Sequence, residues 1–108
     1  MSLAPLLADA RRQGYAVGAF SCLNLETAAG IVAAAQDLRA PAVIAFTARH
    51  AAWVNLPALA AAVRSLAARA DVPLALHLDH AKETAVVETA MEAGFTSVMF
   101  DGSGLPYA

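Results

Sequence analysis

Two histidines and an aspartate stand within four positions of one another, at His77, Asp79 and His80. They follow a short apolar run at residues 74–76, opened by Pro73, which is typical of a strand buried on both faces in a parallel sheet. Catalytic groups of α/β sheets and barrels lie at the carboxyl ends of such strands. Imidazole is the commonest metal ligand, and its second nitrogen needs an acceptor. One interpretation is a metal or acid–base site. The other is that Asp79 caps the next helix and the histidines fill space.

The segments around this cluster alternate between strand and helix patterns. Gly14 and Gly94 are typical helix stops, and Pro41 cannot continue a helix. Apolar residues recur at helical spacing between these stops, and short apolar runs separate them. We expect helices at residues 2–13, 25–39, 56–70 and 82–93, strands at 15–20, 42–46, 74–76 and 97–100, and a loop at 47–55.

This order of strands and helices predicts a parallel sheet. The 108 residues hold four units of about 27 residues each, roughly half of a complete eight-unit barrel of about 250 residues. We therefore predict an α/β fold that supplies the first four β/α units of a (β/α)8 TIM barrel, with residues 1–108 as the N-terminal half of a single barrel domain. The alternative is a complete four-stranded doubly wound domain, which would leave apolar strands at the sheet edges.

The composition excludes several classes of function. The chain is 59% hydrophobic and 15% charged, and its net charge of -2 comes with only seven Lys and Arg. No basic stripe points to a nucleic-acid partner, and no run approaches the roughly 18 apolar residues of a membrane span. The single Cys22 cannot form an internal disulfide and is best interpreted as a small apolar filler. A cytoplasmic location is the default expectation.

Polar residues follow all four expected strands and would converge at one mouth of a barrel. Each also has a structural interpretation: Asn24 is a good helix N-cap, and Thr47 and Ser103 can satisfy backbone groups in loops. Basic and aromatic side chains in the second loop could meet an anionic substrate. The residues at the strand ends are Ser21, Asn24, Thr47, Asp79, His80, Asp101 and Ser103, and those in the second loop are Arg49, His50 and Trp53.

Several segments together resemble the class II fructose-bisphosphate aldolases, and most closely the branch that includes tagatose-bisphosphate aldolases. The resemblance covers nearly the whole chain in the correct order, and its last two segments are specific rather than generic. The segments are Gly18-Ala19-Phe20, Asn24-Leu25-Glu26-Thr27, Pro41-Ala42-Val43-Ile44, His77-Leu78-Asp79-His80 and the run from Ala93 to Ser103.

The resemblance implies a TIM barrel, a sugar phosphate substrate and a divalent metal, usually zinc, with room for a monovalent cation as well. By position, His80 matches a zinc ligand and Asp79 matches the acid/base that moves the proton of the hydroxyl at the cleaved bond. Asp101 falls where the family keeps an acidic residue close to the metal, and we expect it as a second ligand. Asn24, Thr47 and Ser103 are the expected substrate contacts. A homo-oligomer is also expected.

The chain departs from the family pattern at Ser21, where Asn is common, and at Gly104, where His is common. A catalytic zinc site usually takes three protein ligands, and only His80 stands out as one here. We therefore expect the 108 residues alone to be inactive and the completed enzyme to be an aldolase. The alternatives are a non-catalytic half-barrel that self-associates and another metal-dependent barrel enzyme.

Overall fold

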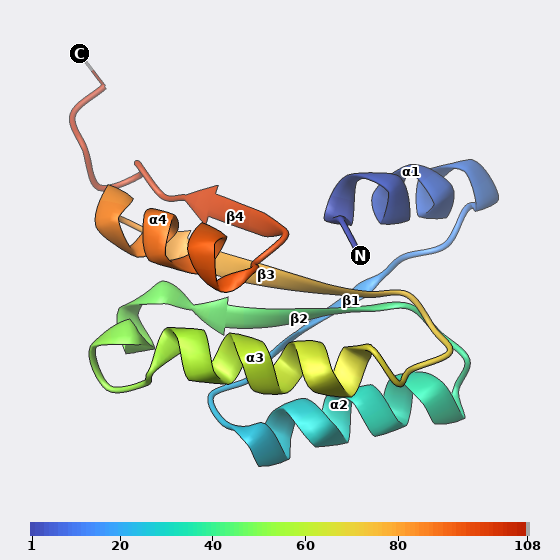
Figure 1. Ribbon diagram of the computed structural model, residues 1–108. Helices are drawn as coiled ribbons and strands as arrows, with labels where there is room; N and C mark the ends of the chain where they lie inside the picture. Colours follow the sequence, from blue (N-terminus) through green and yellow to red (C-terminus); the bar gives the residue numbers. More distant parts are fainter. Residues whose placement is uncertain (108) are drawn as a thin grey trace.

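The computed structural model describes residues 1–107 and contains a four-stranded parallel sheet in the order β1-β2-β3-β4 (Figure 1). Strands that are consecutive in sequence pair with each other, and an α-helix lies between the two strands of each pair along the chain. The elements are α1 (Leu3–Gln13), β1 (Gly18–Ser21), α2 (Leu25–Asp37), β2 (Ala42–Thr47), the 3-10 helix η1 (Ala48–Ala52), α3 (Leu56–Ala67), β3 (Leu74–Ala81), α4 (Thr84–Ala93) and β4 (Ser97–Phe100).

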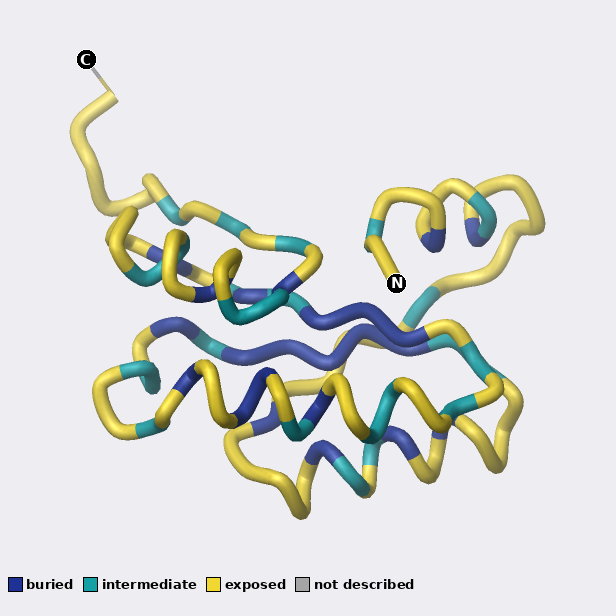
Figure 2. Tube along the Cα trace, viewed as in Figure 1, coloured by how far each residue is buried: buried dark blue, intermediate teal, exposed yellow. Residues whose placement is uncertain are grey.

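Helices α2, α3 and α4 pack on the same face of the sheet. Their buried residues, such as Val32, Val63 and Ala90, form one core cluster with Ile44 and Leu76 of the two central strands. In Figure 2 β2 and β3 are dark blue along most of their length, which marks them as the centre of this core. A doubly wound domain would place helices on both faces and change direction within the sheet. Sequential order with the three crossover helices on one face is the winding of a barrel, as predicted.

Helix α1 covers the opposite face of the sheet, near the amino ends of the central strands. Leu6 of α1 packs with Val43 of β2 and Ala75 of β3 in a second, smaller core cluster. The amino group of Met1 donates to the carbonyl of Leu74 at 2.9 Å, and the Thr96 hydroxyl donates to the carbonyl of Met1 at 2.9 Å. The carboxyl ends of the strands are therefore the end that α1 leaves free.

Several expected boundaries were wrong in detail, because pairing and caps set the ends of elements. The first strand begins at Gly18 rather than Tyr15, since its register with β2 starts at the Gly18–Ala42 pair. Helices α2 and α3 end two and three residues earlier than expected, at Asp37 and Ala67. The segment expected as a loop contains the 3-10 helix η1.

The largest difference from expectation concerns β3. We expected strand only at residues 74–76, with Asp79 and His80 in the following loop. The strand instead continues to Ala81, because residues 77–79 stay in register with β2, and His77 and Leu78 also pair with the first residues of β4. Helix α4 begins at Thr84, so Asp79 is not its N-cap. The capping interpretation of Asp79 was wrong.

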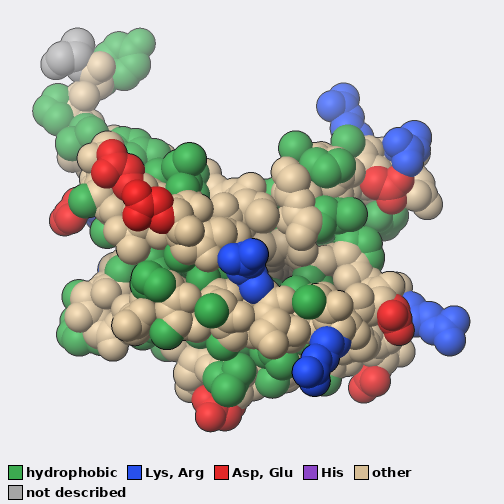
Figure 3. Space-filling model, in the orientation of Figure 1, with side chains coloured by type: hydrophobic (Ala, Val, Ile, Leu, Met, Phe, Trp, Pro, Cys, Tyr) green, Lys and Arg blue, Asp and Glu red, His purple; other side chains and the backbone are tan. Residues whose placement is uncertain are grey.

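The two outer strands have open edges. All four residues of β1 are exposed, and Phe20 in β1 and Phe100 in β4 each retain 51% of their accessible surface. Charged side chains are scattered over the face seen in Figure 3 rather than gathered into a stripe. None of the helices within residues 1–107 is long and apolar enough to cross a membrane.

Candidate functional site

The alternation of side chains along β3 divides its residues between the two faces. Leu74, Leu76 and Leu78 belong to the core cluster under the helices, whereas Ala75 belongs to the cluster under α1. Successive side chains of a strand point to opposite faces, so His77 and Asp79 project from the same face as Ala75. In a barrel this face is the interior. Leu74, Leu76 and Leu78 thus pack the core, whereas His77 and Asp79 project from the opposite face and are available for chemistry.

A bulge then changes the direction of His80. The β3–β4 register shifts between Leu78 and Ala81, and His80 adopts a left-handed backbone with φ of 55°. Continued alternation would have turned His80 toward the helices. Instead Ala81 is fully buried in that core, and the His80 side chain is 57% exposed. Bulges often re-aim a side chain next to an active site, and strained backbone concentrates at functional positions.

The His80 ring contacts the carboxylate that follows β4. Nδ1 of His80 lies 3.2 Å from Oδ2 of Asp101, while Oδ1 of Asp101 accepts a hydrogen bond from the backbone N–H of Ser103 at 3.0 Å. Hydrogen bonds from Ser103 and His80 hold the pKa of the Asp101 carboxyl well below its usual range. Asp101 is therefore an anion, and both of its oxygens have partners within the chain.

Asp79 lies between two imidazoles. Its Oδ2 is 3.6 Å from Nε2 of His80, and its Oδ1 is 3.7 Å from Nε2 of His77. On the other side of the His77 ring, Nδ1 lies 2.7 Å from the hydroxyl oxygen of Ser97. The strand period places His77 on the face of Asp79, because the two residues stand two positions apart. Ser97 was not predicted as a site residue, since its contact with His77 depends on the register between β3 and β4.

The donors around His80 fit one part of a divalent metal site. Its Nδ1 faces the carboxylate of Asp101, the usual partner of a metal-ligating imidazole, and its Nε2 lies 3.6 Å from the carboxylate of Asp79. Imidazole and carboxylate are ligands that zinc accepts. Within residues 1–107, however, His, Cys, Asp and Glu side chains nowhere form a group of three that could hold an ion. These residues therefore fit part of a metal site and do not form a complete one.

The other expected contacts divide into two groups. Thr47 pairs in register with Asp79, and Ser103 is hydrogen-bonded to Asp101, so both lie at this mouth. The Asn24 side chain instead accepts a hydrogen bond from the backbone N–H of Thr27 at 2.9 Å and completes a capping box on α2. Its structural interpretation is confirmed. Cys22 is 1% exposed, which confirms it as a filler, and burial raises the pKa of its thiol.

A groove of about 730 Å³ opens at this mouth, between η1, the end of β3 and the first turn of α4. Arg49 and Lys82 line it together with His80 and the carboxylates of Glu83 and Asp101, so charges of both signs face it. His50 and Trp53 are not among its lining residues and contact each other, with 6.0 Å between ring centroids. Of the second-loop residues, Arg49 is the one that faces the groove.

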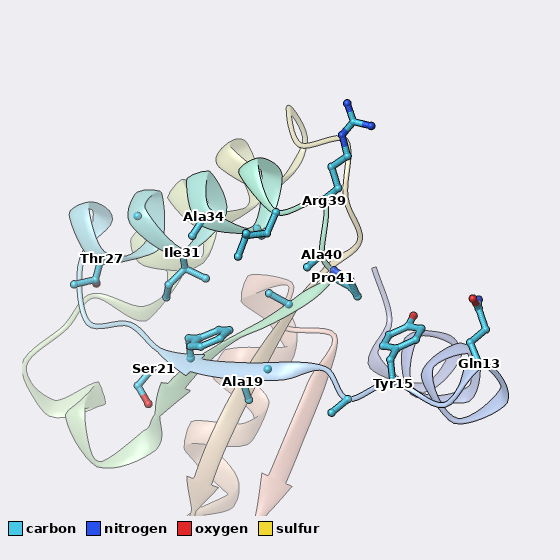
Figure 4. A pocket seen from close by; sticks show the side chains of 17 residues that line it. Gln13, Tyr15, Ala19, Ser21, Thr27, Ile31, Ala34, Arg39, Ala40 and Pro41 are labelled. Carbon is cyan, nitrogen blue, oxygen red and sulfur yellow. The ribbon is translucent and has the colours of Figure 1, made fainter.

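A larger groove of about 1150 Å³ has a different character. It runs between the open edge of β1 and α2, where Ile31 and Ala34 lie over the strand and Tyr15 stands at the α1 end (Figure 4). Its lining is mostly apolar and includes neither His80 nor Asp101, both of which line the smaller groove. This groove is the uncovered flank of an edge strand, so the smaller groove is the better candidate for chemistry.

The sequence profile of the family Fructose-bisphosphate aldolase class-II matches residues 1–108. The chain belongs to this family. Among curated class II relatives, it is 41% identical over 102 residues to the D-tagatose-1,6-bisphosphate aldolase subunit GatY of Klebsiella oxytoca. It is 38% identical over 102 residues to the sulfofructosephosphate aldolase of Alkalicoccus urumqiensis. In each case the match covers 94% of this chain and 36% of the relative.

The class II fold is also found in the solved structures. The crystal structure of the YdjI aldolase from Escherichia coli K12 superposes with a TM-score of 0.90 at 25% identity, over 98% of this chain and 41% of that one. The chain therefore spans well under half the length of the class II aldolases that it matches. Its four parallel strands correspond to the first half of their barrel.

Proposed function

We propose that residues 1–108 form the N-terminal half of a TIM-barrel ketose-bisphosphate aldolase. The reaction is the reversible aldol cleavage of fructose 1,6-bisphosphate or tagatose 1,6-bisphosphate to dihydroxyacetone phosphate and glyceraldehyde 3-phosphate. The observation that carries the proposal is the position of Asp79 between His77 and His80 on the inner face, next to the groove that His80 and Asp101 line. Family membership supports the reaction class.

His80 would hold the divalent metal, which we propose is zinc, through Nε2, because Asp101 already contacts Nδ1. When bound, such an ion supplies Lewis-acid stabilisation of the negative charge that develops on the cleaved ketose. Asp101 keeps the ring of His80 in place, because its Oδ2 faces Nδ1 at 3.2 Å. This contact favours an orienting role for Asp101 over the direct ligation that the resemblance suggested. A monovalent cation remains part of the proposal on the resemblance alone.

Asp79 would act as the base in the direction of cleavage. Its carboxylate accepts the proton of the hydroxyl on the aldehyde side of the breaking carbon–carbon bond. As this proton leaves, the C–O bond becomes a carbonyl and the electrons of the carbon–carbon bond pass to the dihydroxyacetone phosphate fragment. In the synthetic direction Asp79 returns the proton. A carboxylate held on a strand beside the metal-binding imidazole meets the requirement for a fixed proton acceptor.

Thr47 and Ser103 are proposed substrate contacts. Thr47 is the register partner of Asp79 at the end of β2, and Ser103 is hydrogen-bonded to Asp101, so both lie at the same mouth as Asp79. Asn24 stays a predicted contact, although its side-chain oxygen caps α2. Arg49 and Lys82 are the cations of the groove and would pair with a phosphate, beside the carboxylates of Glu83 and Asp101. A cytoplasmic enzyme that assembles as a homo-oligomer is also proposed on the family resemblance.

The direct test is a chimera in which this chain replaces the matching segment of a full-length class II relative. We expect the chimera to cleave a ketose bisphosphate. Asp79→Asn should keep the metal and lose turnover by at least about 100-fold, whereas His80→Ala should lose metal and turnover together. Full metal occupancy in the His80 variant would contradict the ligand assignment. Near-normal turnover in the Asp79 variant would contradict the proton-transfer role.

The second candidate is a half-barrel without catalytic activity that associates with itself. It is favoured by one observation, the apolar open edges formed by Phe20 in β1 and by Phe100 in β4. The two candidates differ in the chimera experiment, because a degenerate half-barrel would fold there without supporting turnover. A third candidate, another metal-dependent barrel enzyme, would bind metal through His80 but leave both ketose bisphosphates uncleaved.

A further inference from the structure

His77 contacts two residues of the site, and neither it nor Ser97 has a role in the reaction derived above. The ring is only 17% exposed, so its surroundings are set by protein rather than by water. Ser97 is its register partner across the β3–β4 pair, on the same face of the sheet. The Ser97 hydroxyl oxygen lies 2.7 Å from Nδ1, which is a short hydrogen bond. Ser97 of the neighbouring strand β4 therefore fixes the orientation of the His77 ring through its Nδ1 atom.

The chemistry of the partners selects one tautomer of the neutral ring. An ionised carboxylate only accepts hydrogen bonds, whereas a serine hydroxyl can donate or accept. With the proton on Nε2, the ring directs N–H at Oδ1 of Asp79, and Nδ1 accepts from Ser97. With the proton on Nδ1, the Nε2 lone pair would face the carboxylate and repel it. The Nε2–H form is the one that satisfies both neighbours.

The distance to Asp79 is 3.7 Å, which is longer than a hydrogen bond of about 3 Å. The final torsion of an aspartate side chain is soft, so a modest rotation of the carboxylate shortens this contact. The other carboxylate oxygen, Oδ2, lies toward Nε2 of His80 at 3.6 Å. The two oxygens of Asp79 are thus in different surroundings.

We propose that His77 is a positioning residue that, with its ring fixed by Ser97, anchors Oδ1 of Asp79 and leaves Oδ2 as the oxygen that exchanges a proton with substrate. The proposal rests on the proposed function of Asp79. In this arrangement Oδ1 fixes the orientation of the Asp79 carboxylate, and Oδ2 exchanges the proton with substrate. Ser97 of β4 then contributes to catalysis through its hydrogen bond with the His77 ring.

The first test is made on the unaltered 108-residue chain by nitrogen-15 NMR of its imidazoles, without metal and at mildly alkaline pH, where imidazole is neutral. The expected result is the Nε2–H tautomer for His77. Asp79→Ala, which removes the acceptor that selects this tautomer, should increase the Nδ1–H fraction, and Ser97→Thr, which keeps a hydroxyl partner for Nδ1, should not. An Nδ1–H tautomer in the unaltered chain would overturn the proposal, because the ring could not then anchor the carboxylate.

The second test follows Asp79 itself. Three-bond couplings to its β protons should report a single χ1 rotamer in the unaltered chain and averaged rotamers in His77→Leu. His77→Gln places an amide N–H near the position of Nε2 and should restore the single rotamer. Unchanged couplings in His77→Leu would overturn the anchoring role. Backbone amide spectra of each variant separate this effect from loss of the fold.

Turnover of the chimera gives a third measurement. His77→Leu should lower kcat on the order of 10-fold with little change in KM, and His77→Gln should recover most of the loss. The NMR measurements use neither metal nor substrate, so they can fail while the aldolase activity is found. Conversely, an inactive chimera with both NMR signatures intact would overturn the proposed function and leave the contact between His77 and Asp79 standing.

Discussion

Leu78 and Ala81 are both fully buried in the core under the helices, although three positions separate them in a strand where alternate residues share a face. The extra residue between them is accommodated by the bulge and by the left-handed backbone of His80. This arrangement brings the imidazole to the same mouth as the Asp79 carboxylate. The position of the proposed metal ligand is therefore a property of the backbone as much as of the side chain.

The first prediction follows from the φ of 55° at His80. Glycine adopts this conformation without the penalty that a Cβ imposes, so His80→Gly should be more stable than His80→Ala by roughly 1 kcal/mol. Urea unfolding of the two variants measures the difference. Equal stabilities would show that the bulge relaxes when the imidazole is removed.

The second prediction concerns Gly94, the C-cap between α4 and β4, which has φ of 99°. A Cβ there would lie 2.8 Å from the Arg64 guanidinium, so Gly94→Ala combines backbone strain with displacement of Arg64, at a cost of roughly 2 kcal/mol. Gly14→Ala is the matched control, because Gly14 has φ of 77° and nothing within 4 Å of its Cβ position. Its cost should be only about 1 kcal/mol. Thermal unfolding of the pair tests the difference.

The third prediction separates the two roles of Asn24. Its side chain caps α2, so Asn24→Ala should cost about 1 kcal/mol of stability. Asn24→Asp should keep the cap, since aspartate is an equally good N-cap. If Asn24 also contacts substrate, the aspartate variant of the chimera will retain stability but show a raised KM for an anionic substrate. Loss of stability in Asn24→Asp would contradict the capping assignment.

The fourth prediction concerns Cys22. The residue is 1% exposed and burial raises the pKa of its thiol, so the reactive thiolate is scarce in the folded chain. We expect a thiol reagent to label Cys22 at the rate at which the chain unfolds, and to label it rapidly in denaturant. Fast labelling under native conditions would show that the region between β1 and α2 opens readily.

The fifth prediction concerns the outer strands. Both β1 and β4 offer unpaired backbone groups and exposed apolar side chains, which favour pairing with another chain. The isolated chain should associate as its concentration rises, and sedimentation over a wide concentration range will detect this. Lys substitutions at Phe20 and Phe100 should weaken the association. A folded chain that stays monomeric throughout would contradict the prediction.

The fold was more predictable from the sequence than the site. The strand and helix order followed from periodicity, and stops such as Gly14 and Gly94 lie where a left-handed residue is required. Sequence indicated that Asp79 and His80 follow a buried run, but it could not show that pairing with β2 carries the strand through Asp79. Nor could it indicate a bulge, because no glycine marks the position. The Ser97 contact depends on the register between strands, which no local pattern specifies.

Sequential strand order also has a consequence for how the chain acquires its structure. Each strand pairs only with its neighbours in sequence, and a whole crossover helix separates the paired residues along the chain. Such non-local pairs form more slowly than the local contacts of a helix. During synthesis each β/α unit can dock as it leaves the ribosome, except that α1 must wait for the Val43 and Ala75 surface that β2 and β3 provide. Asp101 and Ser97 come from the last strand and its end. We therefore expect a nascent chain to hold a nearly complete core before it holds a site.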